Sequence, residues 1–148
     1  MRTENKELLL RDLCGRLPYG VKCENFNHVY GKNIFKVTDI RDNGYICGTI
    51  NNQHGWAVFD PLELKPYLFP MSSITEEQYE SLRESGILSN CSHSYEYVNP
   101  YVHGVSFIFK EFKTYSLELI EWLNKHHFDY HGLIEKGLAI DATNLNIY

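Results

Sequence analysis

The sequence has 148 residues, of which 43% are hydrophobic and 22% charged, and its formal net charge is −5. This length predicts a single domain, residues 1–148, with a composition that is ordinary for a globular protein with a buried core. The absence of any basic run argues against duplex nucleic-acid binding, and no apolar stretch approaches the roughly 20 residues that span a bilayer.

The four cysteines never fall in the C-x-x-C spacing that is typical of zinc ribbons and thioredoxin-like redox sites. The first 13 residues, "MRTENKELLLRDL", place too many charges around too short an apolar run for a signal peptide. We therefore expect a cytoplasmic protein with reduced thiols and no membrane association. The cysteines are Cys14, Cys23, Cys47 and Cys91.

A helix is predicted at the N-terminus, where Thr3 or Asn5 can cap the first turn and Gly15 marks the stop. Its apolar stripe is Leu8, Leu9, Leu10 and Leu13. The next residues, "LPYG" (17–20), are typical of a turn.

Short β-like runs follow the turn, and tight turns join them. "RDNG" (41–44) lies between two of these runs and predicts a hairpin, because Asn-Gly tolerates the positive φ that such turns require. The pattern favours an antiparallel meander of four or five strands, either as a twisted sheet or curled into a small barrel. The predicted strands are 21–26, 33–40, 44–50 and 56–61.

A connector is predicted next, since Pro66 and Pro70 exclude both a regular helix and a central strand there. A helix over 75–86 should follow and end at Gly86. Two capping boxes are available at its start, Ser73 with Glu76 and Thr75 with Gln78.

The last third of the chain alternates strand-like and helix-like patterns. A strand is predicted around 95–98, and a stronger one over 102–112, where alternate residues are apolar. A helix over 116–128 and a short helical turn over 130–137 close the chain. The fold class is therefore α+β, with the sheet between N-terminal and C-terminal helices.

Three segments resemble blocks of a group of uncharacterised proteins associated with prophages and mobile elements of gut bacteria. They are "LLLRDLCGRLPYGVKC" (8–23), "LKPYLFPMSSITEEQYESL" (64–82) and "EWLNKHHFDYHGLIEKGLAIDATNLNIY" (121–148), and they cover 63 of the 148 residues. The resemblance implies an accessory protein of a mobile element in a bacterial cytoplasm. It carries no activity or catalytic residue.

The segment "HHFDYH" (126–131) concentrates three histidines and an aspartate. His127 and His131 are spaced as two zinc ligands would be on one helix, and Asp129 could complete a 2-His-1-carboxylate set. The glutamate of H-E-x-x-H is absent, and Asp129 is itself placed as the N-cap of a new helix. A helix end, with His126 and His127 near its negative pole, explains the cluster more simply than a metal does.

No other motif predicts chemistry. G-x-S-x-G, the Walker A loop and G-x-G-x-x-G are all missing, and no basic cluster lies near a cysteine to lower the pKa of its thiol. We therefore assign no catalytic residue and no cofactor.

The candidate binding surface is the proline-braced segment "DPLELKPYLFP" (60–70), which presents Tyr67, Leu68 and Phe69 in a row, with Trp56 just upstream. Aromatic anchors with an acidic rim are common at protein interfaces. In the alternative interpretation, Leu68 and Phe69 plug the end of the sheet. Exposure of Trp56 and Tyr67 distinguishes the two.

The predicted function is that of a non-catalytic accessory protein that binds another protein. A single-stranded nucleic-acid binder on a small barrel and a small metal-dependent hydrolase using residues 126–131 are the alternatives. The predicted core, from alternation in strands and 3–4 spacing in helices, is Leu9, Leu13, Ile34, Val37, Ile46, Val58, Phe107, Phe109, Leu119, Ile120 and Leu123.

Overall fold

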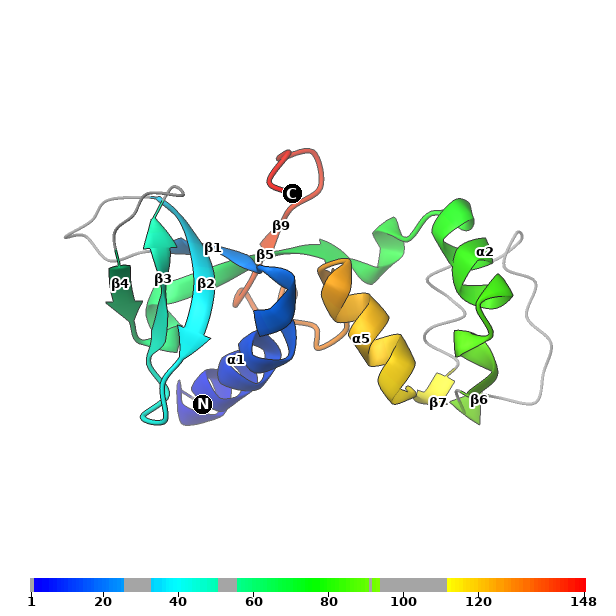
Figure 1. Ribbon diagram of the computed structural model, residues 1–148, viewed down its shortest axis with the longest axis horizontal. Helices are drawn as coiled ribbons and strands as arrows, with labels where there is room; N and C mark the ends of the chain where they lie inside the picture. Colours follow the sequence, from blue (N-terminus) through cyan, green and yellow to red (C-terminus); the bar gives the residue numbers. More distant parts are fainter. Residues whose placement is uncertain (1, 26–32, 51–55, 91, 94–111) are drawn as a thin grey trace. The chain divides into compact units, whose positions relative to one another are not determined.

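The computed structural model describes residues 2–25, 33–50, 56–90, 92–93 and 112–148 (Figure 1). The chain forms two compact units: residues 1–68 with 131–148, and residues 69–130. Whether both unfold together, as the expectation of one domain requires, stays a prediction.

The first unit begins with helix α1 (Arg2–Arg16), followed by the short 3-10 helix η1 (Leu17–Tyr19). The predicted helix is confirmed, but its limits are not: Thr3 and Asn5 lie inside it, and Gly15 does not end it. The reason for the longer helix is Arg16, whose side chain bonds to Asp12 one turn earlier and so favours another helical residue after Gly15.

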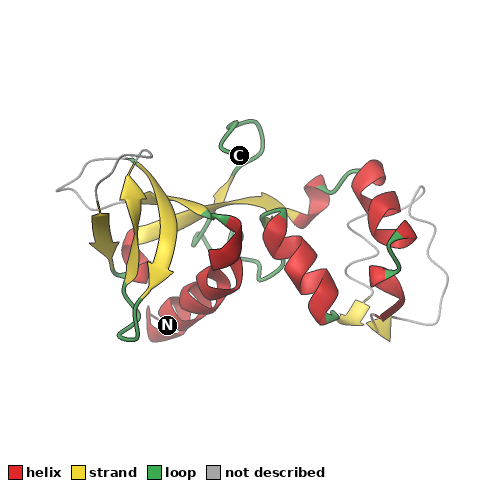
Figure 2. Cartoon of the chain, in the orientation of Figure 1, coloured by secondary structure: helices red, strands yellow, loops and turns green. Residues whose placement is uncertain are grey.

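An open mixed sheet is the other main part of this unit, so the α+β class is confirmed (Figure 2). The sheet is not closed, and the description as a meander or barrel is not confirmed. Its strand order is β4-β3-β2-β1-β5, with antiparallel neighbours, and the short strand β9 adds parallel to β5. The strands are β1 (Lys22–Asn25), β2 (Ile34–Ile40), β3 (Ile46–Ile50), β4 (Trp56–Phe59), β5 (Leu64–Pro70) and β9 (Ile140–Asp141).

The β2–β3 hairpin turns at residues 41–44, as the sequence predicts. The Arg41 N–H donates to the Tyr45 carbonyl at 2.9 Å, and the Gly44 N–H donates to the Arg41 carbonyl at 2.8 Å. Gly44 has φ +83°, which a residue with a side chain rarely adopts.

The segment around the two prolines is a strand, so the prediction of an irregular connector is wrong. A 3-10 turn, η2 (Pro61–Glu63), leads into β5. Pro66 is the last residue of β5 that pairs with β1, and the next residue, Tyr67, pairs with β9 instead. Pro70 ends the strand. Pro66 therefore lies at the end of the β1–β5 ladder and Pro70 at the end of the β5–β8 ladder, so the N–H that each proline lacks does not interrupt a ladder.

Side chains alternate across the sheet, and α1 packs on the inner face (Figure 1). Phe35 and Val37 point inward, which places Ile34 on the outer face, 38% exposed. Val58 is 38% exposed for the same reason, because its neighbours Ala57 and Phe59 fill the core. Ile34 and Val58 were therefore assigned to the wrong face: Ile34 and Val37 are three apart and cannot share one.

Most of the other predicted core residues are buried. Ile120 is half-buried, and Phe107 and Phe109 lie outside the described residues. The confirmed members are Leu9, Leu13, Val37, Ile46, Leu119 and Leu123.

The second unit contains α2 (Glu76–Glu84), whose N-terminus carries the Thr75–Gln78 capping box, and α5 (Leu117–Lys125), capped by Ser116. Leu82, Leu119 and Leu123 from these helices pack in one apolar cluster. The remaining elements of this unit are η3 (Met71–Ser73), η4 (Ile87–Asn90), β6 (Ser92–His93), β7 (Phe112–Thr114) and β8 (Phe128–Asp129).

Three predictions near these elements have different outcomes. The strand predicted around 95–98 lies outside the described residues, as does all but the last residue of the strand predicted over 102–112. No helix forms over 130–137; residues 133–137 form turns, and a helical hydrogen bond joins the Lys136 N–H to the Gly132 carbonyl at 3.3 Å. Asp129 lies in β8, which runs parallel to Phe69–Pro70 of β5, so it caps no helix.

Candidate functional site

His126 and His127 end helix α5. The His126 N–H donates to the Trp122 carbonyl at 3.1 Å, and its ring lies 4.4 Å from the Trp122 ring, centroid to centroid. Burial, and then the charge of Lys125, lowers the pKa of His126. His127 follows with φ +63°, the left-handed conformation that often terminates a helix. The helix-end interpretation of these two histidines is confirmed.

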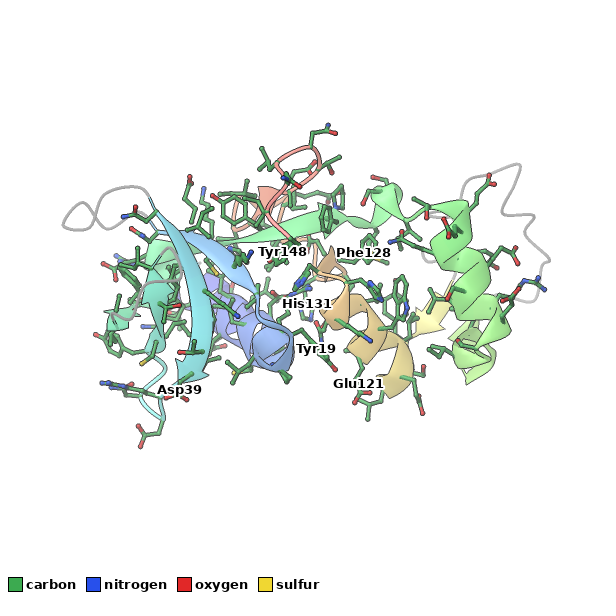
Figure 3. All side chains as sticks on the ribbon, turned by 45° about the horizontal axis from the view of Figure 1, so that its top comes forward. Tyr19, Asp39, Glu121, Phe128, His131 and Tyr148 are labelled. Atoms are coloured by element: carbon green, nitrogen blue, oxygen red, sulfur yellow. The ribbon has the colours of Figure 1, made fainter. Side chains whose placement is uncertain are left out.

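His131, labelled in Figure 3, belongs to the first unit. Its Nδ1 is 2.9 Å from Oδ1 of Asp12. This side-chain contact of His131 involves neither of the other two predicted metal ligands, His127 and Asp129. Within residues 2–25, 33–50, 56–90, 92–93 and 112–148, no group of three His, Cys, Asp or Glu side chains is arranged to hold a metal ion.

Asp12, Arg16 and His131 form a buried polar triad. The Arg16 guanidinium donates twice to the carboxylate, Nε to Oδ2 at 2.8 Å and Nη2 to Oδ1 at 3.0 Å. Both side chains of this ion pair are fully buried, whereas that of His131 is 22% exposed. The triad connects α1 to the segment that begins at His131, 119 residues later.

Electrostatics keep Asp12 ionised. Burial raises the pKa of its carboxyl, but the hydrogen bond to His131 and the charge and hydrogen bonds of Arg16 outweigh burial, so the pKa lies below its usual range. An ionised carboxylate only accepts hydrogen bonds, so Nδ1 of His131 carries the proton in this contact.

A carboxylate that orients an imidazole is two-thirds of a nucleophilic triad, and a reactive nucleophile would be the third part. Cys23 has a thiol whose pKa is affected by the Asp12 charge, and this side chain is fully buried in the core. Burial, and then the Asp12 charge, raises the pKa of that thiol, so it stays protonated and unreactive. Cys23 therefore does not supply the nucleophile, and the contacts of Asp12, Arg16 and His131 join α1 to the segment that begins at His131.

The sequence contains one signal for part of this triad. Asp12 and Arg16 are spaced i, i+4 in a predicted helix and carry opposite charges, which indicates an ion pair. Spacing alone does not tell whether such a pair is exposed or buried, and nothing near His131 in the sequence points to Asp12.

The predicted binding residues are mostly covered. Tyr67 is 7% exposed and Leu68 is fully buried, while Phe69 is partly buried against the apolar cluster of the second unit. Trp56 begins β4, and its side chain lies outside the described part of the structure. The burial of Tyr67 and Leu68 favours the plug interpretation of this segment.

Strand β4 offers a different surface. It pairs with β3 in a regular antiparallel register, and no second strand pairs with it among the described residues. Its sequence, "WAVF", contains no charge and no proline, and Val58 is exposed on its outer face. Natural edge strands discourage pairing with another chain by being very short or by carrying a charge, a proline or a bulge. β4 is short, with four residues, but carries no charge, proline or bulge.

Comparisons of the chain with protein-family models, with curated proteins and with solved structures found no match. None of the described helices is long and apolar enough to cross a membrane.

Proposed function

We propose that this chain is a non-catalytic accessory protein of a phage or mobile element, and that it binds another protein at the edge of β4. The observation that supports the proposal most is this uncharged, regular edge strand with an exposed apolar side chain. Along such an edge, every second residue turns its backbone N–H and C=O away from β3.

The partner in this proposal contributes an extended segment that extends the sheet by one strand. Backbone hydrogen bonds supply the affinity in this mode of binding, and alternate side chains supply specificity. The four residues of β4 are uncharged, so we expect the residues of the partner that pair with them to be uncharged too. The partner residue beside Val58 should be apolar.

The two alternatives have less support. A single-strand nucleic-acid binder needs cations with aromatic faces, and the chain as a whole carries −5. A metal-dependent hydrolase needs converging ligands, whereas Nδ1 of His131 faces Asp12.

Val58→Lys tests the proposal, because a lysine on an edge strand discourages strand addition and position 58 is exposed enough to accept it. A photo-crosslinking amino acid at position 58, introduced in the cell that naturally carries the gene, should capture a discrete partner. Val58→Lys should then reduce the binding of that purified partner by at least about tenfold.

Leu117→Lys is the matched control, since Leu117 is a 68% exposed apolar residue on α5, in the other unit. It should leave binding unchanged. Equal binding by Val58→Lys and the native chain would rule out the β4 edge as the interface.

A further inference from the structure

A tyrosine hydroxyl completes the ladder between β1 and β5. The register pairs Cys23 with Pro66, so the next pair would be Lys22 and Tyr67, beyond the last pair of this ladder. At that position the Lys22 N–H donates to the Tyr148 hydroxyl at 3.0 Å, and the hydroxyl donates to the Tyr67 carbonyl at 2.9 Å. Tyr148 is labelled in Figure 3. The hydroxyl thus replaces a direct backbone hydrogen bond.

Residues Thr143–Tyr148, here called the strap, bring this tyrosine to the seam. The Ala142 N–H donates to the Leu68 carbonyl at 2.8 Å, and the Leu145 N–H then donates to the Ala142 carbonyl at 3.1 Å as the chain turns. The Lys22 ammonium donates to the Ile147 carbonyl at 2.7 Å and lies 5.6 Å from the centre of the Tyr148 ring.

The strap has the properties of an exchangeable ligand. Its hydrogen bonds at the seam involve a tyrosine hydroxyl and one carbonyl, which any peptide with a tyrosine can supply. Leu145 is 48% and Tyr148 is 41% exposed, so burial of apolar surface contributes little to the binding of the strap.

The charges around the seam favour a different occupant. Lys22 on β1 pairs directly with Lys36 on β2, and like charges in a cross-strand pair repel. Lys36 is exposed and makes no ion pair with the described residues, while the strap carries no charged side chain. Glu24 lies on the same face of β1, two residues from Lys22, and the strap gives Lys22 a carbonyl and an aromatic ring but no charged side chain. An anionic side chain beside the tyrosine would therefore add a charge opposite to that of the two lysines.

We propose that the β1–β5 seam is a peptide-binding site for a tyrosine flanked by an acidic residue on another protein, and that the strap occupies this site until such a segment displaces it. The site is separate from the β4 edge and does not depend on it. Burial raises the pKa of the Tyr148 hydroxyl, so a bound tyrosine stays protonated and keeps its donor.

The test uses the full chain with the substitution Tyr148→Ala, in which the strap has lost the tyrosine that fills the site. Synthetic peptides of residues 143–148 are added, and their binding is measured from the amide NMR shifts of the protein. The parent peptide should bind Tyr148→Ala at least about tenfold more tightly than it binds the native chain. Replacing the peptide's tyrosine by phenylalanine should weaken binding by about tenfold, through loss of the hydroxyl. An Asn146→Asp peptide, isosteric but charged, should bind more tightly, and salt should reduce its advantage.

Equal binding by native and Tyr148→Ala chains, or by tyrosine and phenylalanine peptides, would overturn the proposal. So would an aspartate peptide that binds no better than its parent. A concentration-dependent dimer of the native chain that disappears in Tyr148→Ala would identify a second copy as the occupant, against the proposal of another protein.

A second measurement does not depend on the folding of Tyr148→Ala. Tyr148→Phe keeps the ring but removes the hydroxyl, so the Lys22 amide should exchange its hydrogen about tenfold faster or more. The Phe35 amide, within the β1–β2 pair, should be unaffected. Unchanged exchange at Lys22 would mean that the hydroxyl does not close the ladder.

Discussion

Asp12→Asn should destabilise the protein strongly, because it leaves Arg16 as a buried charge without its counter-ion. Both side chains of the pair are fully buried, and the guanidinium makes two hydrogen bonds of 2.8 and 3.0 Å to the carboxylate. Breaking a buried pair by removing one partner costs about 3–5 kcal/mol, and we expect that loss in the free energy of unfolding at pH 7. Urea unfolding followed by tryptophan fluorescence measures it.

The double variant Asp12→Leu/Arg16→Met is the control that separates charge from packing. With neither charge present, its free energy of unfolding should lie within about 1–2 kcal/mol of the native value or exceed it. His131→Gln, which removes only the partly exposed member of the triad, should cost about 1 kcal/mol.

The same pair predicts the pH dependence of stability. The pKa of Asp12 is lower in the folded protein than in the unfolded chain, so its contribution is complete above the unfolded pKa and is lost as the pH falls through the folded one. The stability difference between native chain and Asp12→Asn should therefore shrink below about pH 4. A loss of less than about 1 kcal/mol at pH 7, or a double variant as unstable as Asp12→Asn, would refute the reasoning.

Three further predictions concern other parts of the chain. Leu123→Ala should cost about 2–5 kcal/mol in a thermal melt, since Leu123 is fully buried, whereas Val58→Ala should change stability by less than about 1 kcal/mol. Gly48→Ala should prevent normal folding, seen as lost dispersion in amide NMR spectra, because the added Cβ would overlap the backbone carbonyl of Lys36 on the facing strand. Protein purified without a histidine tag should contain well under one zinc or iron per chain by elemental analysis. A stoichiometric metal that is lost in His131→Ala would restore the hydrolase hypothesis.

The sequence determined those elements whose hydrogen bonds close within a few residues. "RDNG" specifies the β2–β3 hairpin because Asn-Gly supplies the required backbone conformation. The two alternative capping boxes, Ser73 with Glu76 and Thr75 with Gln78, predict the start of α2 to within two residues, and the structure forms the second. His126 and His127 were assigned to a helix end on the same local grounds.

Only the tertiary structure determined which face of the sheet is buried and which residues pair when they are distant in the sequence. Alternation already separates Ile34 from Val37, but only the packing of the sheet decides which of its two faces becomes the core. Pro66 disfavours a central strand by local rules, yet it fits because β5 changes partner at that residue.

The candidate sites show the same division. Asp12 meets His131 across 119 residues, and Tyr148 meets Lys22 across 126. Neither pair leaves a periodic or spaced signal, because a hydrogen bond requires only that two groups meet in space. Spacing in a sequence reports on neighbours along one helix or strand, and only the folded chain shows which distant groups come within bonding distance.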